Sequence, residues 1–389
     1  MTARGCNPAS GGRCALRIVI AGGGTGGHLF PGIAVAEEIR ARHPAHQVLF
    51  ISRGNEFERT ALAAAGLPLA TISVEGLKGR GPRNQLRGLC RLPVSIVQSL
   101  LRLQAFRPHL VIGLGSYSAG PVVMAAWLRR IPVALCEQNV RPGVTNRVLA
   151  RLADRIFTSF DQTEAGFDSA KVRWTGNPLR RQIVEKSART APPDTAPGQR
   201  FTVLIVGGSQ GAHRINTAVI EALGGFGDTA GFFFIHQTGH ADEAMVADAY
   251  QRSGVAARVQ AFFEDMATQY GQAHLVICRA GATTVAEITA LGKASVLIPY
   301  PHAADGHQHL NARRLADAGA AELIDEQELS GARLSERIRF FASHLEALNR
   351  MEQLASRLGK PEAARRIVDE CFRLVAARAP GQRANRLTG

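Results

Sequence analysis

The chain has 389 residues, 46% of them hydrophobic and 20% charged, which is typical of a globular protein with material for two or three domains. Its formal net charge of +14 favours partners that carry negative charge, namely nucleic acid, anionic lipid or phosphorylated ligands. Six cysteines, none of them in a C-x-x-C pair, argue against a disulfide framework or a zinc site.

An apolar run followed by a glycine-rich turn occurs twice, about half a chain apart. The first reads LRIVIA and GGGTGGH over 16–28, and the second reads FTVLIV and GGSQG over 201–211. Glycine has no Cβ, so its backbone can approach an anion closely, and a helix that begins there presents unpaired N–H groups. Two such turns at matching places predict two nucleotide-binding domains that face each other across a cleft.

The first turn satisfies the dinucleotide pattern G-x-G-x-x-G at 22–27. Ser52 and Arg53 stand where an NAD enzyme needs an acid, although Arg53 could hold a 2′-phosphate, so an NADP site remains an alternative. His28 occupies the position where a phosphate-binding P-loop needs lysine. Because it precedes the first helical turn, His28 is a candidate general base, the alternative being a residue that caps the helix.

The region 76–136 contains nine Lys and Arg residues and no Asp or Glu, and leucines are interleaved with the basic residues. Two interpretations have equal weight: a surface that lies on anionic headgroups, or a solvated basic face over core leucines. The uncharged run 108–128 has glycine and proline near its centre, which predicts strand, turn and helix and not a membrane span. The N-terminus shows no secretory signal.

Strand-like runs alternate with helical patterns, which predicts parallel sheets covered by helices on both faces. The runs are 16–21, 47–52, 110–114, 133–137, 156–159, 201–206, 231–236, 258–262, 275–278 and 295–299. Because 186–200 has a linker's composition, we expect two doubly wound domains, at 15–178 and 179–358. An amphipathic helix is expected at 360–378, and 1–14 and 379–389 are expected to be loose tails.

The second turn also matches the G-x-S-x-G nucleophile elbow, with Asp305 and His307 following in the order of an α/β-hydrolase. A hydrolase does not require the matching turn in the first half of the chain. A phosphate cradle, in which the Ser209 hydroxyl donates to a diphosphate oxygen, is therefore the preferred interpretation.

The segment 278–292 runs from a strand end into a helix that carries Glu287, whose carboxylate can accept hydrogen bonds from both ribose hydroxyls. The residues His302, Asp305, His307 and His309 could ligate a metal, but their spacing has no regular register. Binding of sugar hydroxyls by Asp305 and Gln308 is favoured. No D-x-D pattern, the usual metal clamp of metal-dependent sugar transferases, occurs in the chain.

At this point the chain resembles the MurG family of N-acetylglucosaminyltransferases over about 16–378. The resemblance rests on motifs that occur in order: GGGTGGHLFPGIAVAEEI, GSYSAGPVVMAAWL, CEQN, GNPLR, GGSQGAHRIN, CRAGATTVAEI and PYPHAADGHQ. It implies a GT-B architecture, in which two doubly wound Rossmann-like domains face each other across a cleft. It also implies inverting transfer from UDP-N-acetylglucosamine to the 4-hydroxyl of lipid-linked N-acetylmuramoyl-pentapeptide, without metal or other cofactor.

The resemblance also implies roles for individual residues. His28 becomes the base, with Glu137 as the second candidate, and Thr25, Gly26 and Gly27 face the donor sugar and the acceptor diphosphate. Further donor-binding roles fall on Asn139, Arg180, Ser209, Phe263, Ala282, Thr283, Thr284, Val285, Ala286, Glu287 and Gln308.

Three further expectations follow from the resemblance. The C-terminal helix returns to the first domain, and the basic-apolar surface docks on the cytoplasmic face of the membrane. Ser116 stands where the family usually has glycine. Nucleic acid is not expected as a partner, because the aromatic residues are not concentrated among the basic ones.

Overall fold

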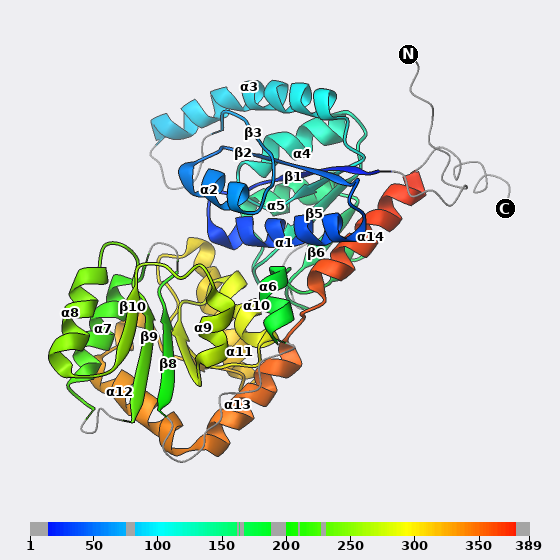
Figure 1. The fold of residues 1–389 in the computed structure, drawn as a ribbon. Helices are drawn as coiled ribbons and strands as arrows, with labels where there is room; N and C mark the ends of the chain where they lie inside the picture. The colour runs from blue at the N-terminus through cyan, green and yellow to red at the C-terminus, as the bar shows by residue number, and fades with distance from the viewer. Residues whose placement is uncertain are drawn as a thin grey trace.

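The computed structural model describes residues 15–74, 82–161, 163, 167–187, 200–208, 211–226 and 231–378, and gives only the backbone of 82–90 and 186–187. Within these residues the chain forms two α/β units, each built on a sheet in which every strand pair is parallel (Figure 1). The predicted linker and both predicted tails lie almost entirely outside the described residues.

The first sheet has seven strands in the order β3-β2-β1-β4-β5-β6-β7. Their bounds are β1 Arg17–Ala21, β2 Gln47–Ser52, β3 Leu69–Thr71, β4 Leu110–Gly113, β5 Val133–Glu137, β6 Arg155–Thr158 and β7 Val172–Trp174. The helices of this part are α1 Gly26–Arg42, α2 Glu56–Ala64, α3 Pro82–Phe106, α4 Ala119–Leu128 and α5 Val144–Leu149, with a 3₁₀ turn η1 at Ala150–Leu152. Strand β1 lies where the strand order reverses, so the turn that follows it opens at a topological switch point.

The second sheet has six strands in the order β10-β9-β8-β11-β12-β13. The bounds are β8 Phe201–Val206, β9 Phe232–Gln237, β10 Ala257–Gln260, β11 Leu275–Cys278, β12 Ala294–Leu297 and β13 Glu322–Leu323. The helices are α6 Arg181–Ser187, α7 His213–Leu223, α8 Glu243–Ser253, α9 Met266–Gln272, α10 Ala282–Ala290, α11 His307–Asp317, α12 Gly331–Ser343 and α13 Leu345–Leu358, with 3₁₀ turns η2 Ala304–Gly306 and η3 Glu326–Glu328. Strand β8 again lies at the switch point, so the two glycine turns occupy equivalent places.

The last helix, α14 (Ala363–Arg378), crosses back to the first unit and lies along α1 (Figure 1). Its residues Ile367, Val368 and Cys371 are fully buried in the same hydrophobic cluster as Ile18 and Ile20 of β1. The apolar stripe read from the sequence therefore faces the first core. The exact domain bounds, 15–178 and 179–358, stay a prediction.

Candidate functional site between the two domains

The first turns of α1 and α10 meet at the junction of the two units. Pro31 lies inside α1 and has no N–H, so the carbonyl of Gly27, four residues earlier, receives no hydrogen bond from it. Instead that carbonyl accepts a hydrogen bond from Thr283 Oγ1 of α10, at 3.3 Å. The N-cap residues Thr25 and Gly281 make no side-chain cap. Two helix N-termini, both without side-chain caps, thus converge, which is the arrangement that binds an anion.

Two N–H groups of the glycine turn before α1 donate hydrogen bonds to side chains of the same domain. Gly23 donates to Ser116 Oγ at 3.1 Å, and Gly24 donates to Glu58 Oε1 at 2.6 Å. Within the described residues, the amides of Thr25, Gly26 and Gly27 have no acceptor. The part of the turn that is open to an anion is therefore the start of α1. Its first glycines shape the turn, Gly24 doing so with a φ of 95°.

Glu58 is a site residue that the sequence reasoning missed. Its carboxylate is buried, accepts from Gly24 and also accepts from the N–H of Asn55 at 2.8 Å, while Asn55 Oδ1 accepts from the N–H of Glu58 at 2.8 Å. This is a capping box at the start of α2, and the letters N-x-x-E at 55–58 are its signature. A Cβ at Gly23 would collide with this carboxylate, so the close approach requires glycine.

His28 lies in the first turn of α1, and its Nδ1 is 3.1 Å from Gln138 Oε1. The amide of Gln138 is oriented by its Nε2, which donates to the Cys136 carbonyl at 3.2 Å, so its oxygen faces the histidine and Nδ1 carries the hydrogen. Nε2 then holds the lone pair. Burial lowers the pKa of His28 from 6.5, against the charge of Glu137 and hydrogen bonds with Gln138 and the backbone of Leu114. Neutral His28 can accept a proton at neutral pH.

Glu137, the second candidate base, is buried and already holds several donors. Its Oε1 accepts from the N–H of Asn139 at 3.0 Å, and its Oε2 accepts from the N–H of Gly143 at 3.1 Å and from Asn146 Nδ2 at 2.8 Å. A carboxylate with these partners orders the loop after β5 and stabilises protonated His28 through its charge. This geometry favours a positioning role for Glu137.

Asn139 takes part in a polar contact between the domains. Asn311 of α11, which is fully buried, donates from Nδ2 to Asn139 Oδ1 at 3.2 Å and accepts at Oδ1 from the N–H of Val140 at 3.1 Å. Asn311 also donates to the carbonyl of Ala280 at 3.3 Å. Sequence reasoning missed Asn311; it lies one helical turn after Gln308, and that spacing could have indicated it.

Arg180 connects the two domains at the other side of the helix junction. Its guanidinium lies over the ring of Phe30 in α1, 4.5 Å from the centroid, and its Nη2 is 3.4 Å from Glu287 Oε1. Tyr270 donates to the other oxygen of Glu287 at 3.0 Å. Burial raises the pKa of Glu287, while Arg180 and Tyr270 oppose that rise. Within the described residues, the buried Arg180 Nε has no acceptor.

The remaining predicted residues differ in how many of their polar groups already have partners. Phe263 is buried and its N–H donates to Gln237 Oε1 at 3.0 Å, which leaves its carbonyl for a base edge. Gln308 accepts from the N–H of Tyr300 at 2.9 Å, which leaves its amide nitrogen for a sugar hydroxyl. Val285 packs in the core, so only its backbone can meet a ligand. Ser209 lies outside the described residues.

Ala282, Thr284 and Ala286 complete the predicted set on α10. Ala282 is buried at the first position of the helix, while Thr284 and Ala286 are partly exposed. Because these residues lie in the first two turns, the N–H groups of that end carry the positive pole of α10.

Comparison with known protein families matches both halves of the chain. The glycosyltransferase family 28 N-terminal domain matches residues 18–158, and the glycosyltransferase family 28 C-terminal domain matches residues 202–367. The two matched segments correspond to the two sheets.

Curated relatives share the whole length. A Myxococcus xanthus protein, named UDP-N-acetylglucosamine--N-acetylmuramyl-(pentapeptide) pyrophosphoryl-undecaprenol N-acetylglucosamine transferase, is 45% identical over 92% of this chain and 93% of its own. A protein of the same name from Anaeromyxobacter sp. is 46% identical over 93% of this chain and 94% of its own.

Solved structures share the fold. The crystal structure of Acinetobacter baumannii MurG superposes with a TM-score of 0.74 at 29% identity, covering 92% of this chain and 99% of that chain. UDP-GlcNAc 2-epimerase from Neisseria meningitidis bound to UDP-GlcNAc gives a TM-score of 0.64 at 15% identity over 92% of this chain and all of that one, which shows the fold alone.

The environment of His28 predicts its titration. By NMR, His28 should titrate below 6.5 in the unmodified protein, because burial outweighs the groups that favour the charged form. Gln138→Leu should lower the pKa of His28 further, since it removes a hydrogen bond that raises it. Gln47→Leu, at the exposed start of β2, serves as the control and should leave the titration unchanged. A value at or above 6.5 would contradict the described environment.

Proposed function

The chain belongs to glycosyltransferase family 28, and we propose that it transfers N-acetylglucosamine from UDP-N-acetylglucosamine to the 4-hydroxyl of a lipid-linked N-acetylmuramoyl-pentapeptide. The observation that carries this proposal is the junction of α1 and α10, where Thr283 meets Gly27 beside His28. The junction brings an anion-binding position and a proton acceptor together. The chain covers nearly the full length of relatives that carry this name, which supports the same reaction here.

The leaving group of this reaction is UDP, and its diphosphate gains negative charge as the bond to the sugar breaks. We assign that diphosphate to the start of α10, whose dipole and unpaired N–H groups are fixed before the reaction begins, and we assign the acceptor's diphosphate to the start of α1. Arg180 adds a guanidinium whose Nε still has a hydrogen bond to donate. Electrostatic stabilisation from this chain's own groups therefore acts where charge develops.

The acceptor hydroxyl attacks the anomeric carbon from the face opposite the diphosphate. The new bond joins the acceptor oxygen to that carbon, the bond to the diphosphate breaks, and the hydroxyl proton goes to Nε2 of His28. Gln138 holds the histidine with Nε2 unprotonated, and the charge of Glu137 stabilises the imidazolium that forms. Inversion at the anomeric carbon follows from a single displacement.

The nucleotide of the donor lies against α10 in this proposal. Glu287 is the candidate partner of the ribose hydroxyls; its carboxylate now accepts from Arg180 and Tyr270, so ribose binding must replace or share one of these hydrogen bonds. The carbonyl of Phe263 meets the uracil, and Gln308 with Asn139 meets the sugar. All these assignments come from position within the family motifs and stay proposals.

No described helix combines the length and the apolar character needed to cross a bilayer. Helices α3 and α4 pack together and expose Val94 (52%), Val97 (54%) and Leu101 (62%) on α3 with Trp127 and Leu128 on α4. Arg129 and Arg130 directly follow Leu128, while Lys78 and Arg80 and the side chains of Arg83 and Arg87 lie outside the described residues. We infer that this α3–α4 surface docks on the anionic cytoplasmic face of the membrane, where the acceptor lipid is held.

Donor binding tests the proposed reaction. UDP-N-acetylglucosamine at about 100 times its Kd should add about 2.7 kcal/mol to the free energy of unfolding. UDP-glucose should give a smaller increase, and NADPH none. Glu287→Gln should weaken the response to both uridine nucleotides, since it removes a carboxylate acceptor for the ribose. Stabilisation by NADPH alone would contradict the proposal.

His28→Ala should lower kcat by about 10² to 10⁴-fold, because it removes the proton acceptor, and leave donor-induced thermal stabilisation unchanged. In the unmodified enzyme, activity should fall on the acid side only below pH 6.5, as the depressed pKa of His28 is reached and the base becomes protonated. This fall of activity at acid pH should be absent in His28→Ala. His240→Ala, at an exposed position in the second domain, is the control. Near-normal turnover by His28→Ala would remove His28 as the base.

Membrane docking should combine charge and apolar burial. Binding to vesicles of phosphatidylglycerol should weaken as salt rises, and Val94→Ser combined with Val97→Ser should weaken it about tenfold. Met245→Ser, an exposed apolar position on α8 of the second domain, is the matched control. Unchanged binding by the double variant would contradict docking through α3.

A further inference from the structure

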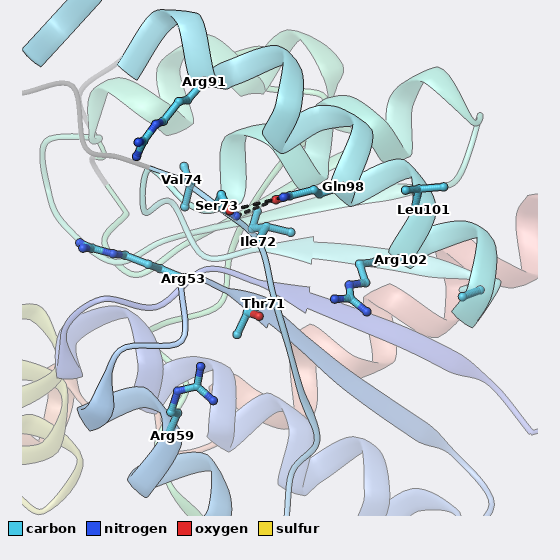
Figure 2. A pocket seen from close by; sticks show the side chains of 11 residues that line it. Arg53, Arg59, Thr71, Ile72, Ser73, Val74, Arg91, Gln98, Leu101 and Arg102 are labelled. Carbon is cyan, nitrogen blue, oxygen red and sulfur yellow. Dashed lines mark hydrogen bonds between the residues drawn. The ribbon is translucent and has the colours of Figure 1, made fainter. Parts of the chain in front are cut away.

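A cavity of about 620 Å³ lies beside α3, away from the junction of α1 and α10. Four arginines line it: Arg53 after β2, Arg59 of α2, and Arg91 and Arg102 of α3. None of its described lining residues is acidic. In Figure 2, Arg91 and Arg102 extend down from α3 and Arg59 extends up from α2 toward the same hollow. A cavity of this size can hold a small ligand, and the positive charge of its four arginines favours an anion.

The cavity opens at the same edge of the sheet as the loop that carries His28. Thr71, which ends β3, and Arg53, which follows β2, both line it, and β2 lies between β1 and β3. Neighbouring strands are about 4.8 Å apart, so the end of β3 is about 10 Å from the end of β1. Glu58 also joins the two places, because it accepts from Gly24 of the loop and precedes Arg59.

We propose that this cavity binds the carboxylates of the acceptor's peptide. The inference rests on the proposed function, since it requires a muramoyl-pentapeptide acceptor. The peptide is attached through a lactyl ether beside the reacting hydroxyl and ends in a free carboxylate. Five extended residues span at most about 17 Å, which exceeds the distance of about 10 Å between the ends of β1 and β3. Guanidinium groups bind carboxylates in bidentate geometry, so the cavity selects the acidic peptide.

Thr71, Ser73 and Gln98 add polar groups between the arginines. Ser73 donates its N–H to Gln98 Oε1 at 2.7 Å, which holds the segment that follows β3 against α3 (Figure 2). The wall between Arg102 and Arg91 is therefore ordered by a hydrogen bond. An ordered wall supports a bound peptide more precisely than an open basic surface does.

The test compares two acceptors that differ only in their peptide carboxylates, which are free in one and amidated in the other. For Arg102→Gln we expect the KM of the free-acid acceptor to rise about tenfold, with kcat and the KM of UDP-N-acetylglucosamine within about twofold of the unmodified enzyme. The amidated acceptor should already have the higher KM with the unmodified enzyme, and Arg102→Gln should not raise it further. Arg53→Gln should behave in the same way.

Arg252→Gln, at an exposed arginine of α8 in the second domain that does not line the cavity, is the matched control and should leave both KM values unchanged. Equal KM values for the two acceptors in all variants would overturn the inference alone. A rise for both acceptors together with weaker vesicle binding would assign the cavity to a lipid headgroup and overturn it too. Absence of transfer by the unmodified enzyme with either acceptor would overturn the proposed function, and the peptide assignment with it.

Discussion

The hydrogen bond from Thr283 to the carbonyl of Gly27 joins the first turns of α1 and α10, and the rest of the site is arranged around it. It exists because Pro31 leaves that carbonyl without its helical donor. The same contact brings two helix N-termini, each with unpaired N–H groups and a positive dipole end, to one junction. In the proposed reaction, the start of α10 stabilises the leaving diphosphate before any side chain has to move.

Opposing interactions set the pKa of His28, the proposed proton acceptor. Burial keeps His28 neutral, while Glu137 and Gln138 limit the cost of charging it once a proton arrives. The carboxylate of Glu137 accepts hydrogen bonds from Asn139, Gly143 and Asn146, which follow β5. One carboxylate therefore shapes the loop that reaches across to Asn311 and supplies the charge that a general base needs.

In the glycine turn before α1, only some of the N–H groups of the motif have no acceptor within the described residues. The N–H groups of Gly23 and Gly24 donate to Ser116 and Glu58, so only the N–H groups at the start of the helix have no acceptor in the described residues. The hydroxyl of Ser116 is the acceptor for the N–H of Gly23. Glu58 links this turn to α2 and, through the next residue Arg59, to the arginine-lined cavity. The first glycine turn, α2 and the cavity are thus connected through Glu58 and Arg59.

Local periodicity in the sequence predicted the two parallel α/β units and most of their strands, and the glycine residues marked the turns after β1 and β8, while the role of His28 stays a prediction. The strands β3, β7 and β13 were not predicted, since runs of two or three residues carry no periodicity. Three features became visible only in the folded chain: which turn amides have no acceptor, the contact of Asn311 with the loop at Asn139, and the packing of α14 on the first core. These contacts join residues far apart in the chain, and the choice among possible partners depends on how the two units dock.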